Sequence, residues 1–233
     1  MLVKYWMRKD VPTIDVNASM QDAMVCMKEH KVALLPVMQK NQLIGVVTDR
    51  DLKRASASDA TSLDIHELIY LLSRIKVSDI MSRKPVTLAP DLTLEEAASI
   101  LLKNNFSGAP VINGDGKVIG LISNHELFQA LISLSGLEQR GVQFAFQLED
   151  RPGAIGEVLE IIRVHCGRLV SILTSCERAP AGYRHVYIRA HSIERSQVPA
   201  MLAEMREKGT VLYFVDHRDN TRQEFIESFA SPL

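Results

Sequence analysis

A hydroxyl and a carboxyl side chain stand three residues apart where an expected apolar strand gives way to an expected helix. In GVVTDRDL (45–52) an expected strand ends at Thr48 and an expected helix follows. The unpaired N–H groups and the positive dipole of a helix start can hold a phosphate, and Arg50 can pair with one. The carboxylate of Asp51 can accept two hydrogen bonds from a ribose diol. The segment therefore has the chemistry to bind a nucleotide.

The same spacing also predicts a purely structural role. Thr48 and Asp51 stand three residues apart, which is the pattern of a capping box that stabilises a helix start without any ligand. A residue that caps a helix can also face a ligand. The capping and the nucleotide interpretations therefore stay open together.

A second segment, GLISNHEL (120–127), carries the same pattern with two changes. Glu126 stands in the place of the Asp, and its extra methylene moves the carboxylate by about 1 Å or more. His125 stands in the place of the Arg, which makes a phosphate contact there dependent on pH. We expect this second site to be empty, weaker or tuned to another ligand.

These two segments belong to an internal repeat. Residues 7–55 align with 81–130, at an offset of 74 as far as Val37 and of 75 from Ile44 onward. Each copy predicts the order β-α-β-β-α. In the first copy the expected elements are a strand over 13–16, a helix from its cap Ser19 to His30, strands over 34–38 and 43–48, and a helix over 49–57. A helical connector is expected over 63–75, and the two copies are expected to bury their sheets against each other.

The chain changes its pattern after the repeats. Alternating apolar residues predict a strand over 142–148. Asp150 is expected to cap a helix from Pro152 to His165, closed by Gly167. The remaining expected elements are strands over 169–175, 184–190 and 211–215, and a helix over 196–208 that stops at Gly209. This βαββαβ order predicts a ferredoxin-like domain, an antiparallel sheet with two helices on one face. In the tail 220–233, Phe225, Ile226 and Phe229 at helical spacing predict docking on this domain or on a partner.

Composition limits the possible functions. Of the 233 residues, 46% are hydrophobic, and the net charge of −1 argues against nucleic-acid binding. No apolar run is long enough to span a membrane, and no signal peptide is evident. The three cysteines form no CxxC pair and predict reduced, buried thiols in a cytoplasmic protein. We expect no catalytic residue and no metal site, because no nucleophile elbow, P-loop, HExxH or zinc cluster occurs.

GVVTDRDL and GLISNHEL, with the approach segments KVALLPV (31–37) and NFSGAPV (105–111), resemble paired CBS domains. The resemblance covers residues 1–135 and implies repeats at 1–58 and 77–135 joined by a connector at 59–76. It implies an adenine nucleotide (AMP, ADP or ATP) as a regulatory ligand, with no other cofactor. The implied nucleotide-binding residues are Thr13, Ala33, Leu34, Thr48, Arg50, Asp51, Thr87, Gly108, Ala109, Ser123, His125 and Glu126.

LEDRPGAIGEVLEII (148–162) resembles the signature of ACT domains, D-x-P-G-x-[IL]. The resemblance implies a domain at 140–217, followed by a tail at 218–233. It also implies an amino acid or small organic acid as effector, bound to the loop residues Asp150, Arg151, Pro152, Gly153, Ala154 and Ile155. The alternative is a helix start in an unliganded dimerisation domain. The Asn frequent in that family is replaced by Cys166-Gly167-Arg168, which weakens the assignment of an amino acid.

The combination of the two resemblances points to a class of function. Paired CBS repeats with a terminal ACT domain resemble the acetoin-utilisation B protein family, which implies metabolic regulation. We expect a homodimer, because exposed sheet edges and repeat faces need cover, and we expect a metabolic enzyme as its target. The alternatives are a structural oligomerisation subunit with vestigial pockets and an enzyme with an unrecognised site.

Overall fold

The computed structural model describes residues 1–59 and 72–225. The chain divides into two units, Met1–Ala130 and Leu131–Leu233. The first unit has two hydrophobic clusters, one in each repeat, and the second unit has one. Of the expected connector helix, residues 72–74 are helical, and the rest lies outside the described residues.

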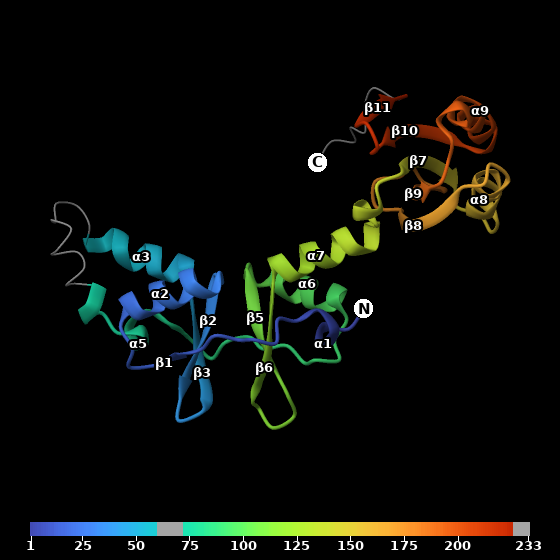
Figure 1. Ribbon diagram of the computed structural model, residues 1–233. Helices are drawn as coiled ribbons and strands as arrows, with labels where there is room; N and C mark the ends of the chain where they lie inside the picture. Colours follow the sequence, from blue (N-terminus) through green and yellow to red (C-terminus); the bar gives the residue numbers. More distant parts are fainter. Residues whose placement is uncertain (60–71, 226–233) are drawn as a thin grey trace. The chain divides into compact units, whose positions relative to one another are not determined.

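The first unit contains both repeats, and the first repeat has the predicted β-α-β-β-α order (Figure 1). The elements of the first repeat are β1 (Ile14–Asp15), α2 (Met20–His30), β2 (Leu34–Gln39), β3 (Gln42–Thr48) and α3 (Asp49–Asp59). Those of the second are α6 (Leu94–Lys103), β5 (Gly108–Ile112), β6 (Val118–Ser123) and α7 (Asn124–Ser135). The counterpart of β1 is reduced to a single parallel bridge between Leu88 and Val111. The prediction of a mixed α/β repeat is confirmed.

Local capping explains where the first long helix of each repeat begins. The Oγ of Ser19 accepts a hydrogen bond from the N–H of Asp22, whose carboxylate accepts one from the N–H of Ser19. Thr93 and Glu96 make the same reciprocal pair at the start of α6. Each pair satisfies two N–H groups that the helix leaves free.

Two short segments pack crosswise between the repeats. The segment of α1 (Val3–Trp6) and Met7 lies at the start of the first repeat but joins the core of the second. The segment of α5 (Val77–Ile80) and β4 (Ser82–Arg83) lies at the start of the second repeat, and β4 pairs with β3 of the first. The sheets are therefore β1-β2-β3-β4 and β5-β6.

Glycine is required where these segments cross the strands. A Cβ on Gly45 would lie 2.8 Å from the backbone oxygen of Ser82 and 2.9 Å from the sulfur of Met81. A Cβ on Gly120 would overlap the sulfur of Met7. Both glycines allow the close approach of a neighbouring segment rather than an unusual backbone angle.

The second unit is an antiparallel sheet with two helices. Its elements are β7 (Val142–Glu149), α8 (Ala154–Val164), β8 (Arg168–Ser175), β9 (Tyr183–His191), α9 (Val198–Lys208), β10 (Thr210–Asp216) and β11 (Thr221–Glu224). Short 3-10 turns cover Leu137–Gln139 and Arg195–Gln197. The strand order is β11-β10-β7-β9-β8, with antiparallel pairing throughout. The predicted βαββαβ order is present, and β11 is an additional strand beside β10.

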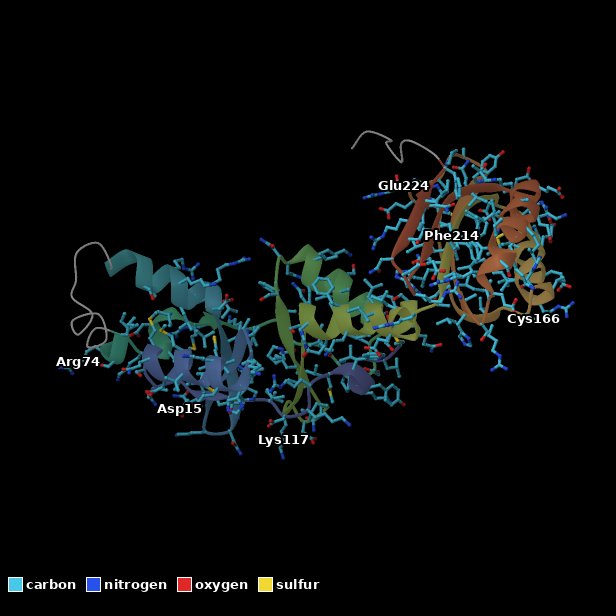
Figure 2. All side chains as sticks on the ribbon, turned by 45° about the horizontal axis from the view of Figure 1, so that its top comes forward. Asp15, Arg74, Lys117, Cys166, Phe214 and Glu224 are labelled. Carbon is cyan, nitrogen blue, oxygen red and sulfur yellow. The ribbon has the colours of Figure 1, made fainter. Side chains whose placement is uncertain are left out.

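The two faces of this sheet differ. Alternate residues of the central strands, such as Phe144, Phe146 and Ile188, are buried against α8 and α9, and Phe214 lies inside the unit (Figure 2). The other face carries polar and aromatic side chains, including Gln143 and Tyr187. Only the face toward the helices forms the apolar core.

Three details of the sequence prediction are wrong in this unit. Asp150 does not cap α8, because the helix begins after Gly153 and has no side-chain cap. The left-handed residue that ends α8 is Cys166, with a φ of 57°, rather than Gly167. Residues 221–224 are a strand rather than part of a helix, because they pair with β10, and residues after 225 lie outside the described part.

The cysteines are less buried than expected. Cys166 and Cys176 are exposed and Cys26 is half-buried. Cys166 lies at the periphery of the second unit (Figure 2) because it occupies the exposed turn after α8. Burial raises the pKa of the Cys26 thiol. The prediction of three buried thiols is therefore wrong for two of them.

Within the described residues no helix is long and apolar enough to cross a membrane. The same residues contain no group of three or more His, Cys, Asp or Glu side chains that could hold a metal ion.

Candidate functional site

The start of α3 holds Thr48 and Asp51 in reciprocal contact. The carboxylate oxygen Oδ2 of Asp51 accepts hydrogen bonds from the N–H of Thr48 at 3.0 Å and from its hydroxyl at 2.7 Å. The N–H of Asp51 donates to the Oγ1 of Thr48 at 3.3 Å. This is the geometry of a capping box, so the capping interpretation holds for the protein without ligand.

The second carboxylate oxygen of Asp51 faces a cation. Its Oδ1 lies 2.8 Å from the Nη2 of Arg54, one turn further along α3. Asp51 is only 7% exposed, whereas the side chain of Arg54 is 73% exposed. An exposed guanidinium can move aside, so Oδ1 is the oxygen that a ligand hydroxyl could reach without breaking the cap.

The ends of β2 and β3 lie next to this helix start. Leu34 pairs with Thr48 across the two strands, and the N–H of Asp49 donates to the carbonyl of Ala33 at 3.0 Å. Ala33 is exposed and Leu34 is buried. The structure therefore brings Ala33 and Leu34 together with Thr48 and Asp51.

The other two predicted residues of the first repeat are exposed. Thr13 is exposed and precedes β1, whose Ile14 pairs with Val37 beyond Leu34 on β2. Arg50 is exposed on the first turn of α3. Its guanidinium makes no hydrogen bond or ion pair with the residues described, which leaves it available to an anion.

The second repeat builds the same cap with a longer acid. The Oε2 of Glu126 accepts hydrogen bonds from the N–H of Ser123 at 2.8 Å and from its hydroxyl. Glu126 is 7% exposed, as Asp51 is. Glu126 therefore reaches the N–H and the hydroxyl of Ser123 as Asp51 reaches those of Thr48, in spite of its extra methylene. His125 is exposed, and its backbone N–H donates to the Oγ of Ser123.

The two caps differ in what surrounds the second oxygen. Gln129 stands at the position of Arg54, at the offset of 75, so no guanidinium is available there. Among the described residues Glu126 has no ion-pair partner. Its Oε1 is therefore free of the competition that Arg54 provides at Asp51.

The wall of the second site includes one residue that the sequence prediction missed. The N–H of Asn124 donates to the carbonyl of Ser107 at 3.0 Å, as Asp49 does to Ala33. Gly108 pairs with Ser123, as Leu34 does with Thr48. Ser107 is thus the counterpart of Ala33. The repeat offset of 74, which applies before the loop, takes Ala33 to Ser107, whereas the offset of 75 takes it to Gly108.

The other predicted residues of the second repeat are less accessible. Ala109 is 1% exposed and belongs to the core of the repeat. Thr87 is half-buried and precedes the bridge of Leu88 with Val111. Arg54 was missed as well, although its spacing of three residues from Asp51 on a helix is a signal that predicts an ion pair.

Both helix starts lie toward the middle of the first unit. In Figure 1, α3 and α7 run outward from β2 and β5 in opposite directions, and β2 and β5 are neighbours. The N-terminal ends, with their caps, therefore lie on the inner sides of the two repeats. Two positive dipole ends in one unit favour an anionic ligand.

The predicted effector loop of the second unit already has internal partners. The Oδ1 of Asp150 lies 2.7 Å from the Nη2 of Arg184, and Arg151 pairs with Glu149 and Glu157. The hydrogen bond from Arg151 lowers the pKa of Glu157. Pro152 and Gly153 are exposed, Ala154 is buried and Ile155 is half-buried. A ligand ammonium at Asp150 would have to compete with Arg184.

Comparison with known proteins agrees with the repeat architecture. The model of the CBS domain family matches residues 3–58 and 77–133. A CBS domain-containing protein of Dictyostelium discoideum is 31% identical over 134 residues, which are 57% of this chain and 92% of that protein. The fold and the matched repeats define a paired-repeat module. The chain belongs to the CBS domain family.

Other relatives share the same region. CBSX2, a chloroplastic CBS domain-containing protein of Arabidopsis thaliana, is 30% identical over 145 residues, which are 54% of this chain and 61% of that protein. The crystal structure of CBSX2 in complex with AMP covers 56% of this chain and 96% of that chain, with a TM-score of 0.47. The inosine-5'-monophosphate dehydrogenase of Korarchaeum cryptofilum is 30% identical over 120 residues, which are 52% of this chain but only 22% of that enzyme.

Proposed function

We propose that this chain is a regulatory protein that binds an adenine nucleotide at the inner ends of α3 and α7. The observation that carries the proposal is the buried carboxylate of Asp51, whose Oδ1 faces the exposed guanidinium of Arg54. Membership of the CBS domain family supports a regulatory role rather than a catalytic one. The relative CBSX2, crystallised in complex with AMP, supports an adenine nucleotide as the class of ligand.

Each group has a distinct role in this proposal. Asp51 accepts the ribose hydroxyls through Oδ1 while Oδ2 keeps its bonds to Thr48. Arg54 turns from the carboxylate toward the phosphate, and Arg50 also faces the phosphate. Ala33 and Leu34 border the adenine through backbone groups beside the helix start. The cap is therefore retained, and the ribose replaces Arg54 at a single oxygen of Asp51, Oδ1.

The second repeat supplies the corresponding site. Glu126 takes the place of Asp51, Ser123 that of Thr48, and His125 that of Arg50. Gly108, together with Ser107, borders the base, and Thr87 and Ala109 lie behind it. Because no arginine competes for the Oε1 of Glu126, a less charged adenosine ligand suits this site.

Calorimetric titration of the full chain with AMP, ATP and S-adenosylmethionine tests the proposal. Asp51→Asn is expected to weaken AMP binding roughly tenfold or more, because a charged acceptor is lost. Asp22→Asn is the matched control, since it removes the acid of a capping box in the same repeat away from the site. Equal losses in the two variants, or no binding by the wild type, would show that Asp51 only caps its helix.

For the second unit we propose an ACT-type, ferredoxin-like domain that senses an amino acid or small organic acid at the loop 150–155. Gly153 has a φ of 90°, and no described residue other than its two chain neighbours comes within 4 Å of where its Cβ would be, so the loop is open on that side. A homodimer, a metabolic enzyme as target and a role in acetoin utilisation complete this proposal. If no amino or organic acid raises the melting temperature of the wild type, the unliganded alternative gains support.

A further inference from the structure

A row of polar side chains crosses the face of the second sheet that carries no helix. Strand register places Arg189 opposite Gln143, Gln143 opposite Val215, and Val215 opposite Arg222. Directly paired residues of a sheet point to the same face. Arg189, Gln143, Val215 and Arg222, one from each of four adjacent strands, therefore share one row.

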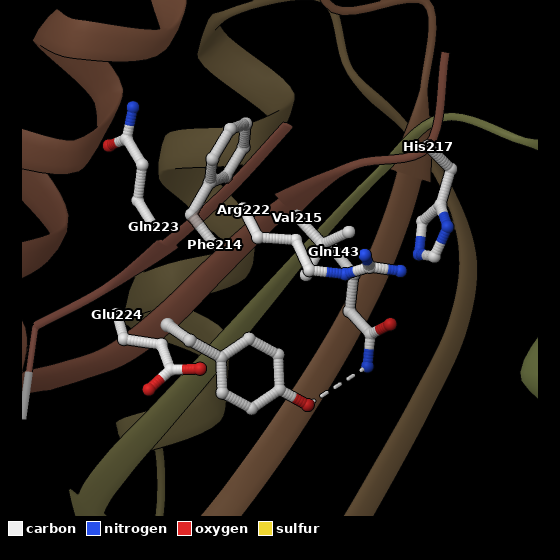
Figure 3. A pocket seen from close by; sticks show the side chains of 8 residues that line it. Gln143, Phe214, Val215, His217, Arg222, Gln223 and Glu224 are labelled. Atoms are coloured by element: carbon white, nitrogen blue, oxygen red, sulfur yellow. Dashed lines mark hydrogen bonds between the residues drawn. The ribbon is translucent and has the colours of Figure 1, made fainter. Parts of the chain in front are cut away.

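A pocket lies over this row. It has a volume of about 260 Å³ and is lined by Gln143, Tyr213, Phe214, Val215, His217, Arg222, Gln223 and Glu224. Figure 3 shows the guanidinium of Arg222 close to Gln143 and His217, while Glu224, which pairs with Tyr213 across the strands, lies toward the other end. The size suits a small metabolite rather than a nucleotide.

Two buried nitrogens in this region have no hydrogen-bond partner among the described residues. They are the Nη1 of Arg189 and the Nε2 of His217. The other nitrogens of Arg189 are held, since Nε donates to the carbonyl of Ser135 and Nη2 to the Oε1 of Gln143, both at 2.8 Å. A buried polar atom without a partner is costly, so such atoms often mark the place of a ligand or ion.

The charge around these nitrogens is positive. Burial lowers the pKa of Arg189 and of His217, and the neighbouring charges of Arg189 and Arg222 lower the pKa of His217 further. Asp216 acts in the opposite direction on His217, but its carboxylate is already paired with Arg218. Arg222 is exposed, and its side chain has no ion pair within the part of the chain that the structure describes. An anion would offset this excess of positive charge.

We propose that this pocket binds a small oxyanion, a carboxylate or a phosphate group. Arg222 and His217 contact the anion, and Gln143 orients it while Arg189 fixes Gln143. The site is distinct from the loop 150–155, because Gln143 stands at the beginning of β7 and the loop follows its end. It is also separate from the nucleotide site, since all of its residues belong to the second unit.

Titration of the full chain with acetate and, in a second arm, with inorganic phosphate tests the proposal. Chloride at the same ionic strength is the reference, and the ring resonances of His217 in NMR spectra are the readout. These signals are assigned with His217→Gln and report binding at the pocket that His217 lines. The arm with the tighter binding distinguishes a carboxylate from a phosphate as the ligand class.

Two variants make the same change of charge at different places. Arg222→Gln is expected to weaken anion binding roughly tenfold. Arg178→Gln, at an exposed arginine outside the pocket, should leave the affinity unchanged. Glu224→Gln is expected to raise the affinity, because a nearby negative charge is removed. No shift of the His217 signals in either arm, or equal affinities in the Arg222 and Arg178 variants, would overturn the proposal.

Discussion

The two repeats build the same helix cap from different acids and then diverge at one position. Asp51 and Glu126 are equally buried, and each accepts two hydrogen bonds from the hydroxyl residue three positions earlier. Arg54 occupies the remaining oxygen of Asp51, whereas Gln129 stands in that place in the second repeat. The length of the acid therefore matters less than the cation beside it, and the two sites differ mainly in charge.

The largest effect is expected when each acid is removed. Asp51→Ala should cost roughly 1.5–3 kcal/mol of nucleotide binding, or about 10- to 150-fold in affinity, because a ribose diol loses a charged acceptor. Glu126→Ala should cost less, since a phosphate at that site faces His125 rather than an arginine. Calorimetry with AMP on both variants measures the difference. Equal affinity of the wild type and Asp51→Ala would falsify the assignment of Asp51.

The next largest effect is expected at Gly45 and Gly120, where a segment crosses a strand in each repeat. Gly45→Ala should lower the free energy of unfolding by about 1–3 kcal/mol, because the new Cβ meets the backbone of Ser82. Gly120→Ala meets the side chain of Met7, so the double variant with Met7→Ala should regain part of the loss. Met81→Ala should not rescue Gly45→Ala. Urea unfolding of the four variants checks this, and equal rescue at both glycines would contradict the packing described.

The caps of the two long helices give a smaller effect that depends on pH. Ser19→Ala should cost about 1 kcal/mol at neutral pH, like Thr93→Ala. Hydrogen bonds from the Ser19 side chain and backbone lower the pKa of Asp22 in the folded state. A carboxyl group whose pKa is lower in the folded state stabilises the protein at pH values above its unfolded-state pKa. This stabilisation is lost as the pH falls through the folded-state pKa. The cost of Ser19→Ala should therefore shrink in acid, and a cost independent of pH would argue against this box.

The smallest effect is expected from exchanging the residues beside the acids. Arg54→Gln should strengthen the binding of adenosine, which has no phosphate, by a few-fold at most, because an exposed ion pair no longer competes. Gln129→Arg should weaken the binding of adenosine at the second site by a similar factor. Titrations of both variants with adenosine test the comparison directly. A loss of adenosine binding in Arg54→Gln would mean that Arg54 contacts the nucleoside itself.

Much of the fold follows from local sequence patterns. The capping boxes at Ser19, Thr48 and Thr93 were predictable because their partners stand three residues away on the same helix start. The β-α-β-β-α order repeats because the same apolar periodicity recurs. The strand β11 was missed, because its residues 221–224 are polar and exposed and become a strand only by pairing with β10.

The candidate sites divide in the same way. Spacing alone identifies Thr48 with Asp51 and Ser123 with Glu126, since a helix start needs both partners close in sequence. Ser107 was missed because the inserted residue in the loop hides the correct offset. The expected cap at Asp150 failed because Arg184, 34 residues further along, binds that carboxylate instead.

The sequence by itself determined the two repeats, the order of their elements, the caps and the class of ligand that such a helix start attracts. These depend on contacts within a few residues and on periodicity, which the chain carries along its length. Only the tertiary structure decided that 1–7 packs on the second repeat and 77–83 on the first. It also decided that Arg189, Gln143 and Arg222 share one row, because strands far apart in sequence meet there in a register that long-range packing selects.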